Sequence, residues 1–220
     1  MLRNKIIKIE HKLVEKTNPY LGGIRRWYYG IDSDFTIISN NCWAGSVYRW
    51  FNLPYLTPTA GLYFYANDYN RFLGNLKYYC SLELEEISLK DSKHRNTQIE
   101  RKQEHVPIGR LDDVEIIFLH YPTFQEAKEK WERRCSRICW DHLIVKNAEM
   151  NECCLKNIIE FDKLPFDNKF IFTAKDYRIS SQVIFKEYLS DGVVKDDTTL
   201  FNKYINLANL IKGLPFKINQ

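Results

Sequence analysis

The segment FTIISNNCWAGSVYRWFN, residues 35–52, decides how this chain is interpreted. Its first four residues form a short apolar run with β-branched side chains, which is typical of a buried strand. The helix-capping residues Ser39-Asn40-Asn41 follow at once, and a helix is predicted from Cys42 to about Asn52. Pro54 ends that helix. A strand that leads directly into a helix is the basic unit of an α/β fold.

The same alternation continues along the chain. Short apolar runs alternate with amphipathic stretches, which predicts a layered α/β/α fold around a largely parallel or mixed central sheet. Residues 88–105 are polar and aperiodic and are predicted to be a loop. The predicted strands are residues 35–38, 82–87, 114–119, 143–145, 170–172 and 183–185. The predicted helices are residues 2–16, 42–52, 67–79, 123–137, 151–163 and 198–212.

Charge divides the chain into two parts. The 220 residues carry a net charge of +4, but residues 1–30 alone carry +5, so the remainder sums to −1. We therefore predict a basic N-terminal helix and linker at 1–30, followed by one α/β domain at 31–220. A near-neutral body argues against a nucleic-acid-binding domain, which normally spreads Lys and Arg over a whole face.

The basic arm has two interpretations. Apolar residues at helical spacing give residues 2–16 one apolar stripe, and residues 18–23 are predicted to be a turn-rich linker. Most amphipathic helices cover their own domain, which is the favoured interpretation. Alternatively, the arm makes a weak contact with anionic lipid at the inner face of the membrane.

The cysteines and the N-terminus indicate the cytoplasm. The chain shows no secretory signal and no run of 18 apolar residues. Six cysteines are present, but the adjacent pair Cys153-Cys154 makes a poor disulfide framework in a chain of this size. Reduced thiols and no structural disulfide are expected.

Polar side chains follow several predicted strands. In open parallel sheets, ligands bind beyond the carboxyl ends of the strands, so these side chains are expected to line one cleft. The candidate catalytic residues are His120 and Cys42, and the candidate substrate-binding residues are Asn40, Asn41, Trp43, Tyr121, Lys146 and Lys175.

The turn at residues 39–45 is the first candidate for chemistry. Free backbone N–H groups at a helix N-terminus favour an anion such as phosphate, and a thiol in the first helical turn, here Cys42, has a lowered pKa. In the alternative interpretation, the helix is simply capped, and Cys42 and Trp43 only pack against the rest of the domain.

His120 is the second candidate for chemistry. It suits proton transfer or a structural hydrogen bond equally well, and with Cys42 it would form a nucleophile–base pair.

Two further groups of residues give weaker evidence for a functional site. Arg133 or Arg134 could fork onto a phosphate or carboxylate, although a solvated helix face is the favoured interpretation. The set Cys135, Cys139 and His142 matches no familiar zinc module, so no metal is predicted. No dinucleotide, P-loop or nucleophile-elbow motif is present, and no cofactor is predicted.

Several ordered blocks resemble one family. The segments IISNNCWAGSVYRWFNLPYLTPTAGLYFY, VPIGRLDDVEIIFLHY, AKEKWERRCSRICWDHLIVK and FDKLPFDNKFIFTAK look like an uncharacterised bacterial DUF family whose members are often labelled exopolysaccharide biosynthesis proteins. The resemblance covers roughly residues 35–210. The family commonly has Gly where this chain has Ala44, and Asn where it has Cys139.

The resemblance implies a role in surface-glycan assembly without implying a reaction. A glycosyl or related group transfer on an activated sugar is the favoured hypothesis, with a nucleotide sugar or glycan precursor as the ligand. A Cys42/His120 acyl transferase or hydrolase is the alternative enzyme. A non-catalytic partner in the glycan pathway is the third hypothesis, and the oligomeric state is left open.

Overall fold

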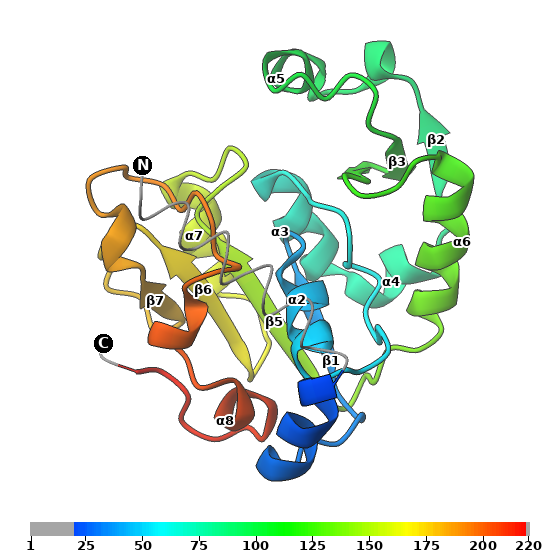
Figure 1. Cartoon of the computed structure of the whole chain (residues 1–220). Coiled ribbons are helices and arrows are strands. Elements are labelled where there is room, and N and C mark those ends of the chain that lie inside the picture. Colours follow the sequence, from blue (N-terminus) through cyan, green and yellow to red (C-terminus); the bar gives the residue numbers. More distant parts are fainter. Residues whose placement is uncertain (1–19, 219–220) are drawn as a thin grey trace.

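The computed structural model describes residues 20–218 and confirms a layered α/β fold (Figure 1). A four-stranded parallel sheet has the order β1-β5-β6-β7, and a three-stranded antiparallel sheet has the order β2-β3-β4. The strands are β1 (Thr36–Ser39), β2 (Glu85–Ile87), β3 (Ile108–Leu111), β4 (Val114–Ile117), β5 (Leu143–Ala148), β6 (Lys169–Thr173) and β7 (Gln182–Ile184).

Helices cover both faces of the parallel sheet. The labelled α-helices are α2 (Trp43–Trp50), α3 (Ala66–Gly74), α4 (Leu76–Ser81), α5 (Arg95–Glu100), α6 (Phe124–Cys135), α7 (Leu155–Asp162) and α8 (Leu207–Ile211). Short 3-10 turns lie at Leu89–Asp91, Lys186–Tyr188 and Phe201–Lys203. Within the described residues, no helix combines the length and the hydrophobicity that crossing a bilayer requires.

Alternate residues of each strand enter opposite cores. Ile37 packs with α2 and α8, whereas its neighbour Ile38 packs with α3, α6 and α7. Phe170 and Ile171 of β6 divide in the same way. Both faces of these strands are apolar because both are covered, which explains their short continuous apolar runs.

The strand predicted at residues 114–119 belongs to the smaller sheet. β4 pairs antiparallel with β3, and the pair leads outward to β2 and α5, at the upper right of Figure 1. Strand type and length were visible in the sequence, but strand order was not. His120 therefore follows a strand of the antiparallel sheet rather than a carboxyl end of the parallel sheet.

The polar segment 88–105 is helical where a loop was predicted. It contains the turn Leu89–Asp91 and α5. Gln98 is fully buried and donates hydrogen bonds to the hydroxyls of Tyr63 and Tyr65, at 2.8 and 3.0 Å. These side-chain contacts order the segment, and apolar periodicity does not reveal them.

The sequence predicts a turn-rich linker at residues 18–23, whereas the structure has a helix at residues 20–29. A Cβ on Gly22 would lie 2.7 Å from the Cβ of Asn52, so the glycine allows this helix to approach the end of α2 closely. The predicted helix at 2–16 lies outside the described residues.

Strand β1 forms one edge of the parallel sheet, and local segments take up its outward polar groups. The backbone N–H of Ser39 donates to Thr59 Oγ1 at 3.0 Å, and that of Ile37 donates to the Tyr48 hydroxyl at 3.2 Å. The Thr36 hydroxyl donates to the Leu56 carbonyl at 2.8 Å. The loop containing Leu56 and Thr59 is thus tied along β1.

Candidate functional site

A cleft of about 470 Å³ opens between α2, the loop at Ala60 and Gly61, and α6. Its lining is rich in positive charge and in hydroxyl groups. The lining residues are Cys42, Gly45, Ser46, Arg49, Tyr55, Ala60, Gly61, His120, Tyr121, Lys130, Arg134 and Thr198. Among these twelve residues there is no carboxylate, which makes the cleft suited to an anion.

Arg134 is the central feature of this cleft. Only 7% of the residue is exposed, and its Nη1 donates to the Ala60 carbonyl at 3.2 Å and to the Tyr121 hydroxyl at 2.5 Å. Its guanidinium also lies 4.9 Å from the ring centre of Tyr55. Within the described part of the chain, no carboxylate lies within ion-pair distance of this guanidinium. A buried arginine without a counter-ion is costly, so a bound anion would stabilise it.

Tyr121 and Gly61 set the position of Arg134. The Tyr121 hydroxyl accepts from Arg134 and donates to the Ala60 carbonyl at 2.6 Å. Burial raises the pKa of Tyr121, although Arg134 opposes the shift, so the hydroxyl keeps its proton. Gly61 has φ +83°, and a Cβ there would lie 2.9 Å from Tyr121 Cε2. The chain therefore requires glycine where the loop meets the tyrosine ring.

Two further cations flank Arg134. Lys130 precedes it by one helical turn on α6, forms an ion pair with Glu126 and lies 5.4 Å from the Tyr121 ring centre. Arg49 is exposed on α2 and lines the opposite side of the cleft. The positive charge of the cleft thus comes from side chains of two helices.

Two of the backbone donors predicted to bind an anion at residues 39–45 are occupied. Asn41 Oδ1 accepts from the N–H of Trp43 at 3.2 Å, and Ser39 Oγ accepts from the N–H of Ala44 at 3.3 Å. The first turn of α2 is therefore capped by its own preceding side chains. An anion site on the rest of this turn stays a prediction, and Gly45, the next residue of the turn, lines the cleft.

Cys42 lines the cleft as a thiol. Burial, with a smaller contribution from Asp197, raises its pKa to about 11, and its Sγ lies 3.6 Å from the Leu62 carbonyl. A position beside a helix N-terminus normally lowers a thiol pKa, but desolvation outweighs that effect here. The geometry does not favour a thiolate nucleophile at neutral pH.

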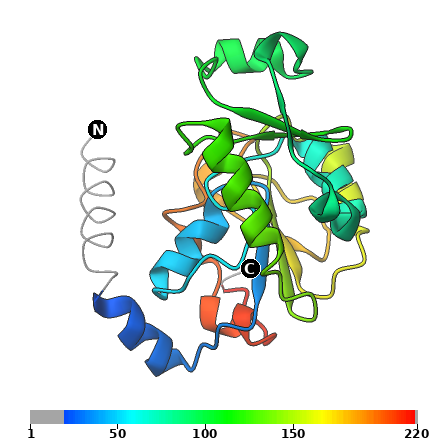
Figure 2. The ribbon, with the colours of Figure 1, turned by 90° about the vertical axis from the view of Figure 1, so that its right-hand side faces the viewer.

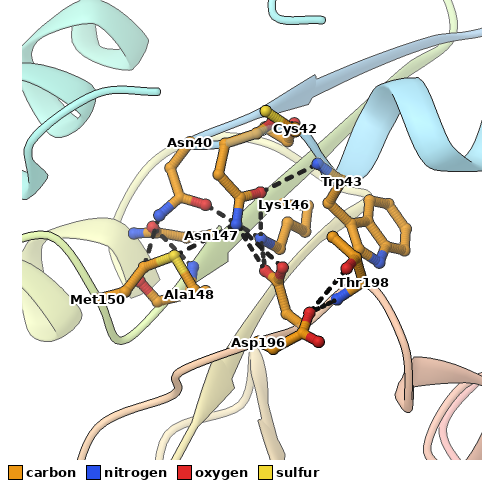
Figure 3. A network of polar contacts seen from close by, with 12 residues as sticks. Asn40, Cys42, Trp43, Lys146, Asn147, Ala148, Met150, Asp196 and Thr198 are labelled. Carbon is orange, nitrogen blue, oxygen red and sulfur yellow. Dashed lines mark hydrogen bonds and ion pairs between the residues drawn. The ribbon is translucent and has the colours of Figure 1, made fainter. Parts of the chain in front are cut away.

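Lys146 lies beneath the cleft in a buried network (Figure 3). It forms an ion pair with Asp197 and donates to Asn40 Oδ1 and Asn41 Oδ1, both at 3.0 Å. Asn41 Nδ2 donates in turn to the two carboxylate oxygens of Asp197, at 2.9 and 3.0 Å. Met150 Sδ also accepts from this amide nitrogen at 3.2 Å. This network joins the ends of β1 and β5 to the segment that carries Thr198.

Three of the eight predicted site residues lie in the cleft lining, and five do not. Cys42, His120 and Tyr121 share the cleft, and their roles stay predictions. Lys146, Trp43 and Asn40 are buried, at 0%, 0% and 1% exposure, and Asn41 belongs to the same network as Lys146, so their contact with a substrate stays a prediction. Lys175 follows β6, two strands away from β1, and is not part of the cleft lining.

Three residues that the sequence did not select define the site. The charged sequence around Arg134 predicts a solvated helix face, because burial of one residue on a charged helix is invisible without the packing partners. Arg49 carries no distinguishing pattern. Asp197 belongs to an acidic pair, Asp196-Asp197, and only tertiary structure brings it to Lys146.

The cysteines do not form a metal centre or a disulfide. All six are free thiols. Within residues 20–218, no group of three or more His, Cys, Asp or Glu side chains is arranged to hold a metal ion.

Comparison with known proteins identifies the family. Residues 24–212 match the family described as Domain of unknown function (DUF1919), so this chain belongs to it. The chain is also similar to a protein of Haemophilus influenzae, strain Rd, which is described only as an uncharacterized protein. The two are 35% identical over 142 residues, which is 64% of this chain and 63% of that relative. The alignment thus spans somewhat less than two thirds of either protein.

Proposed function

We propose that the cleft binds a phosphate-bearing sugar precursor, such as a nucleotide sugar, and that the chain transfers a glycosyl or related group during surface-glycan assembly. The observation that carries the proposal is Arg134, a buried guanidinium without a carboxylate partner among the described residues. Planar guanidinium groups bind phosphate oxygens in pairs, which makes them well suited to diphosphates.

The other lining residues fit the same ligand. Arg49 and Lys130 would add positive charge on two sides of a diphosphate, and Tyr55 offers a ring near the guanidinium for a sugar or a base. A volume of about 470 Å³ lies in the range of pockets for small ligands. Six free thiols suit a reducing compartment, so the proposal includes a cytoplasmic location.

His120 is the proposed proton acceptor. Its backbone N–H donates to the Gly61 carbonyl at 3.0 Å, and its exposed side chain lines the cleft. In the transfer, the bond between the anomeric carbon and the diphosphate breaks, and a bond from that carbon to an acceptor oxygen forms. The acceptor proton passes to His120, and the nucleoside diphosphate leaves with both bonding electrons.

The alternatives rest on weaker observations. A Cys42/His120 acyl transferase or hydrolase would need a thiolate, whereas the pKa of Cys42 is raised to about 11. A non-catalytic partner in the glycan pathway would bind the same anion without turning it over, so ligand binding and turnover must be measured separately.

Binding is tested first with Arg134→Gln and with Arg133→Gln as the matched control. Arg133 is the exposed neighbour of Arg134 on α6 and lies outside the cleft lining. Calorimetry with nucleoside diphosphates, nucleotide sugars and inorganic pyrophosphate should show binding by the wild type. Arg134→Gln should bind about 10- to 150-fold more weakly, because hydrogen bonds to charged groups contribute about 1.5–3 kcal/mol. Arg133→Gln should bind as the wild type does.

Turnover is tested with His120→Ala. Release of nucleoside diphosphate from the bound nucleotide sugar should fall, while binding is retained. Failure of all these phosphates to bind the wild type would refute the proposal, and binding without any turnover would favour the non-catalytic partner. Circular dichroism of each variant separates loss of function from loss of fold.

A further inference from the structure

The helix at residues 20–29 has one docked side. Gly22 lies against Phe51 and Asn52, and the Arg25 guanidinium lies 3.8 Å from the ring centre of Trp50. Tyr29 makes an edge contact with Phe51, with 6.5 Å between ring centres. The helix is thereby held on the end of α2 through positions 22, 25 and 29, which fall on one side of a helical wheel.

The opposite side of this helix carries large apolar side chains that lie in solvent. Tyr20, Ile24, Trp27 and Tyr28 have the spacing of a single helix face, and they are 81%, 62%, 82% and 74% exposed. Figure 2 shows the helix, in blue, at the periphery of the molecule. Single exposed apolar residues need no explanation, but four on one face mark an interaction surface.

Positive charge adjoins this face on the helix itself, and the exposed Asp32 and Asp34 follow the helix. Arg26 is exposed on the same helix, and the Lys212 ammonium lies 3.6 Å from the Cβ position of Gly30, just beyond the helix. Residues 20–30 contain no acidic residue. An apolar cavity of about 240 Å³, lined by Tyr29, Trp50 and Leu207 among others, lies on the docked side.

We propose that this face binds the surface of an anionic lipid bilayer. Trp and Tyr prefer the interface between water and lipid, because their rings are apolar and their edges carry a hydrogen-bonding group. Flanking Arg and Lys complement anionic headgroups. Aromatic rings, one aliphatic side chain and adjacent cations, without an acid on the helix itself, fit a headgroup layer better than a protein partner with both charge signs.

The test uses the full chain and vesicles of phosphatidylcholine with or without phosphatidylglycerol. The wild type should co-sediment with the anionic vesicles at low salt, and raising the salt should release it, since exposed charges are screened. Trp27 is the most exposed tryptophan of the described residues, so its emission should shift to the blue on binding. Neutral vesicles should bind the chain more weakly.

Two variants and one control make the test specific. Trp27→Ser/Tyr28→Ser should bind anionic vesicles roughly tenfold more weakly and lose the blue shift, and Arg26→Glu should weaken binding mainly at low salt. Tyr78→Ser, at a residue of α4 that is 41% exposed outside this face, should bind as the wild type does. Nucleotide binding in the cleft is measured alongside and should be unchanged in all three.

Three outcomes would overturn the proposal. The first is that the full chain does not bind anionic vesicles at low salt. The second is that the double variant binds them as tightly as the wild type. The third is that sedimentation velocity shows a dimer that dissociates in the double variant, while neither protein binds vesicles. The last outcome would assign the face to a second copy of the chain.

Discussion

Removing the partner of Lys146 tests whether the network under the cleft determines stability. Asp197→Asn keeps the size of the side chain and removes its charge, while Lys146 stays fully buried. Breaking a buried ion pair by removing one partner costs about 3–5 kcal/mol, because the remaining charge is left uncompensated. For a chain of this length, each kcal/mol lowers the melting temperature by about 2–4 °C, so a decrease of about 6–20 °C is expected.

The pH dependence gives a second, independent measurement. Burial lowers the pKa of Lys146 from its ordinary 10.5, although Asp197 raises it. Between the folded pKa and 10.5, the unfolded chain binds more protons than the folded chain, so this lysine makes stability rise with pH across that window. Removing Asp197 lowers the folded pKa further and widens the window. The loss of unfolding free energy caused by Asp197→Asn should therefore become smaller as the pH rises toward 10.5.

Thermal unfolding by circular dichroism measures both effects. Asp191→Asn removes the partner of Lys195 in an exposed pair of the same region and should leave the melting temperature unchanged. The double variant Lys146→Met/Asp197→Leu should recover part of the loss, although Asn40 and Asn41 lose a donor. A melting temperature for Asp197→Asn within about 2 °C of the wild type would refute the reasoning, since that is less than 1 kcal/mol.

Three other changes have defined outcomes. Gly61→Ala should lower the free energy of unfolding by about 1–3 kcal/mol in chemical denaturation, because an alanine there is strained and approaches Tyr121. The control Gly74→Ala, whose Cβ would meet nothing within 4 Å, should leave that free energy unchanged. Native Cys42 should be alkylated slowly at neutral pH, with a rate that keeps rising to about pH 11 in peptide mass spectrometry; a plateau below pH 9 would contradict its raised pKa. Gln98→Ala should accelerate hydrogen exchange in α5 without changing the parallel sheet, and equal acceleration in both would show that α5 unfolds only with the whole domain.

The parts of the fold that sequence reasoning predicted are those with a local signal. Thr123 accepts a hydrogen bond from the N–H of Glu126 and begins α6, as its position before a charged amphipathic stretch predicts. The apolar runs of β1, β5 and β6 also carry their own signal. What the sequence did not predict depends on distant partners, such as the assignment of β4 to a separate sheet and the ordering of α5 by Gln98.

The candidate site divides along the same line. The composition of the turn after β1 is visible locally and predicts Cys42 as a site residue, and Cys42 does line the cleft. The state of its thiol depends on burial, which no local pattern reports, and the helix-end rule predicted the opposite shift. Lys146 is predicted as a substrate-binding residue because it ends a strand, whereas in the structure it forms a buried ion pair with Asp197, 51 residues later. Charge pairing across such a distance is a property of the folded chain.

The contacts along β1 have a consequence for assembly. An edge strand offers unpaired backbone groups to other chains, which invites strand addition and aggregation. Here Thr59 and the Tyr48 hydroxyl occupy the outward N–H groups of Ser39 and Ile37, so this edge cannot accept a further strand without displacing the loop that forms the cleft wall. The loop that brings Ala60 and Gly61 to the cleft therefore also protects the edge of the sheet from pairing with another chain. Any variant that loosens this loop to widen the cleft would also increase the tendency to self-associate.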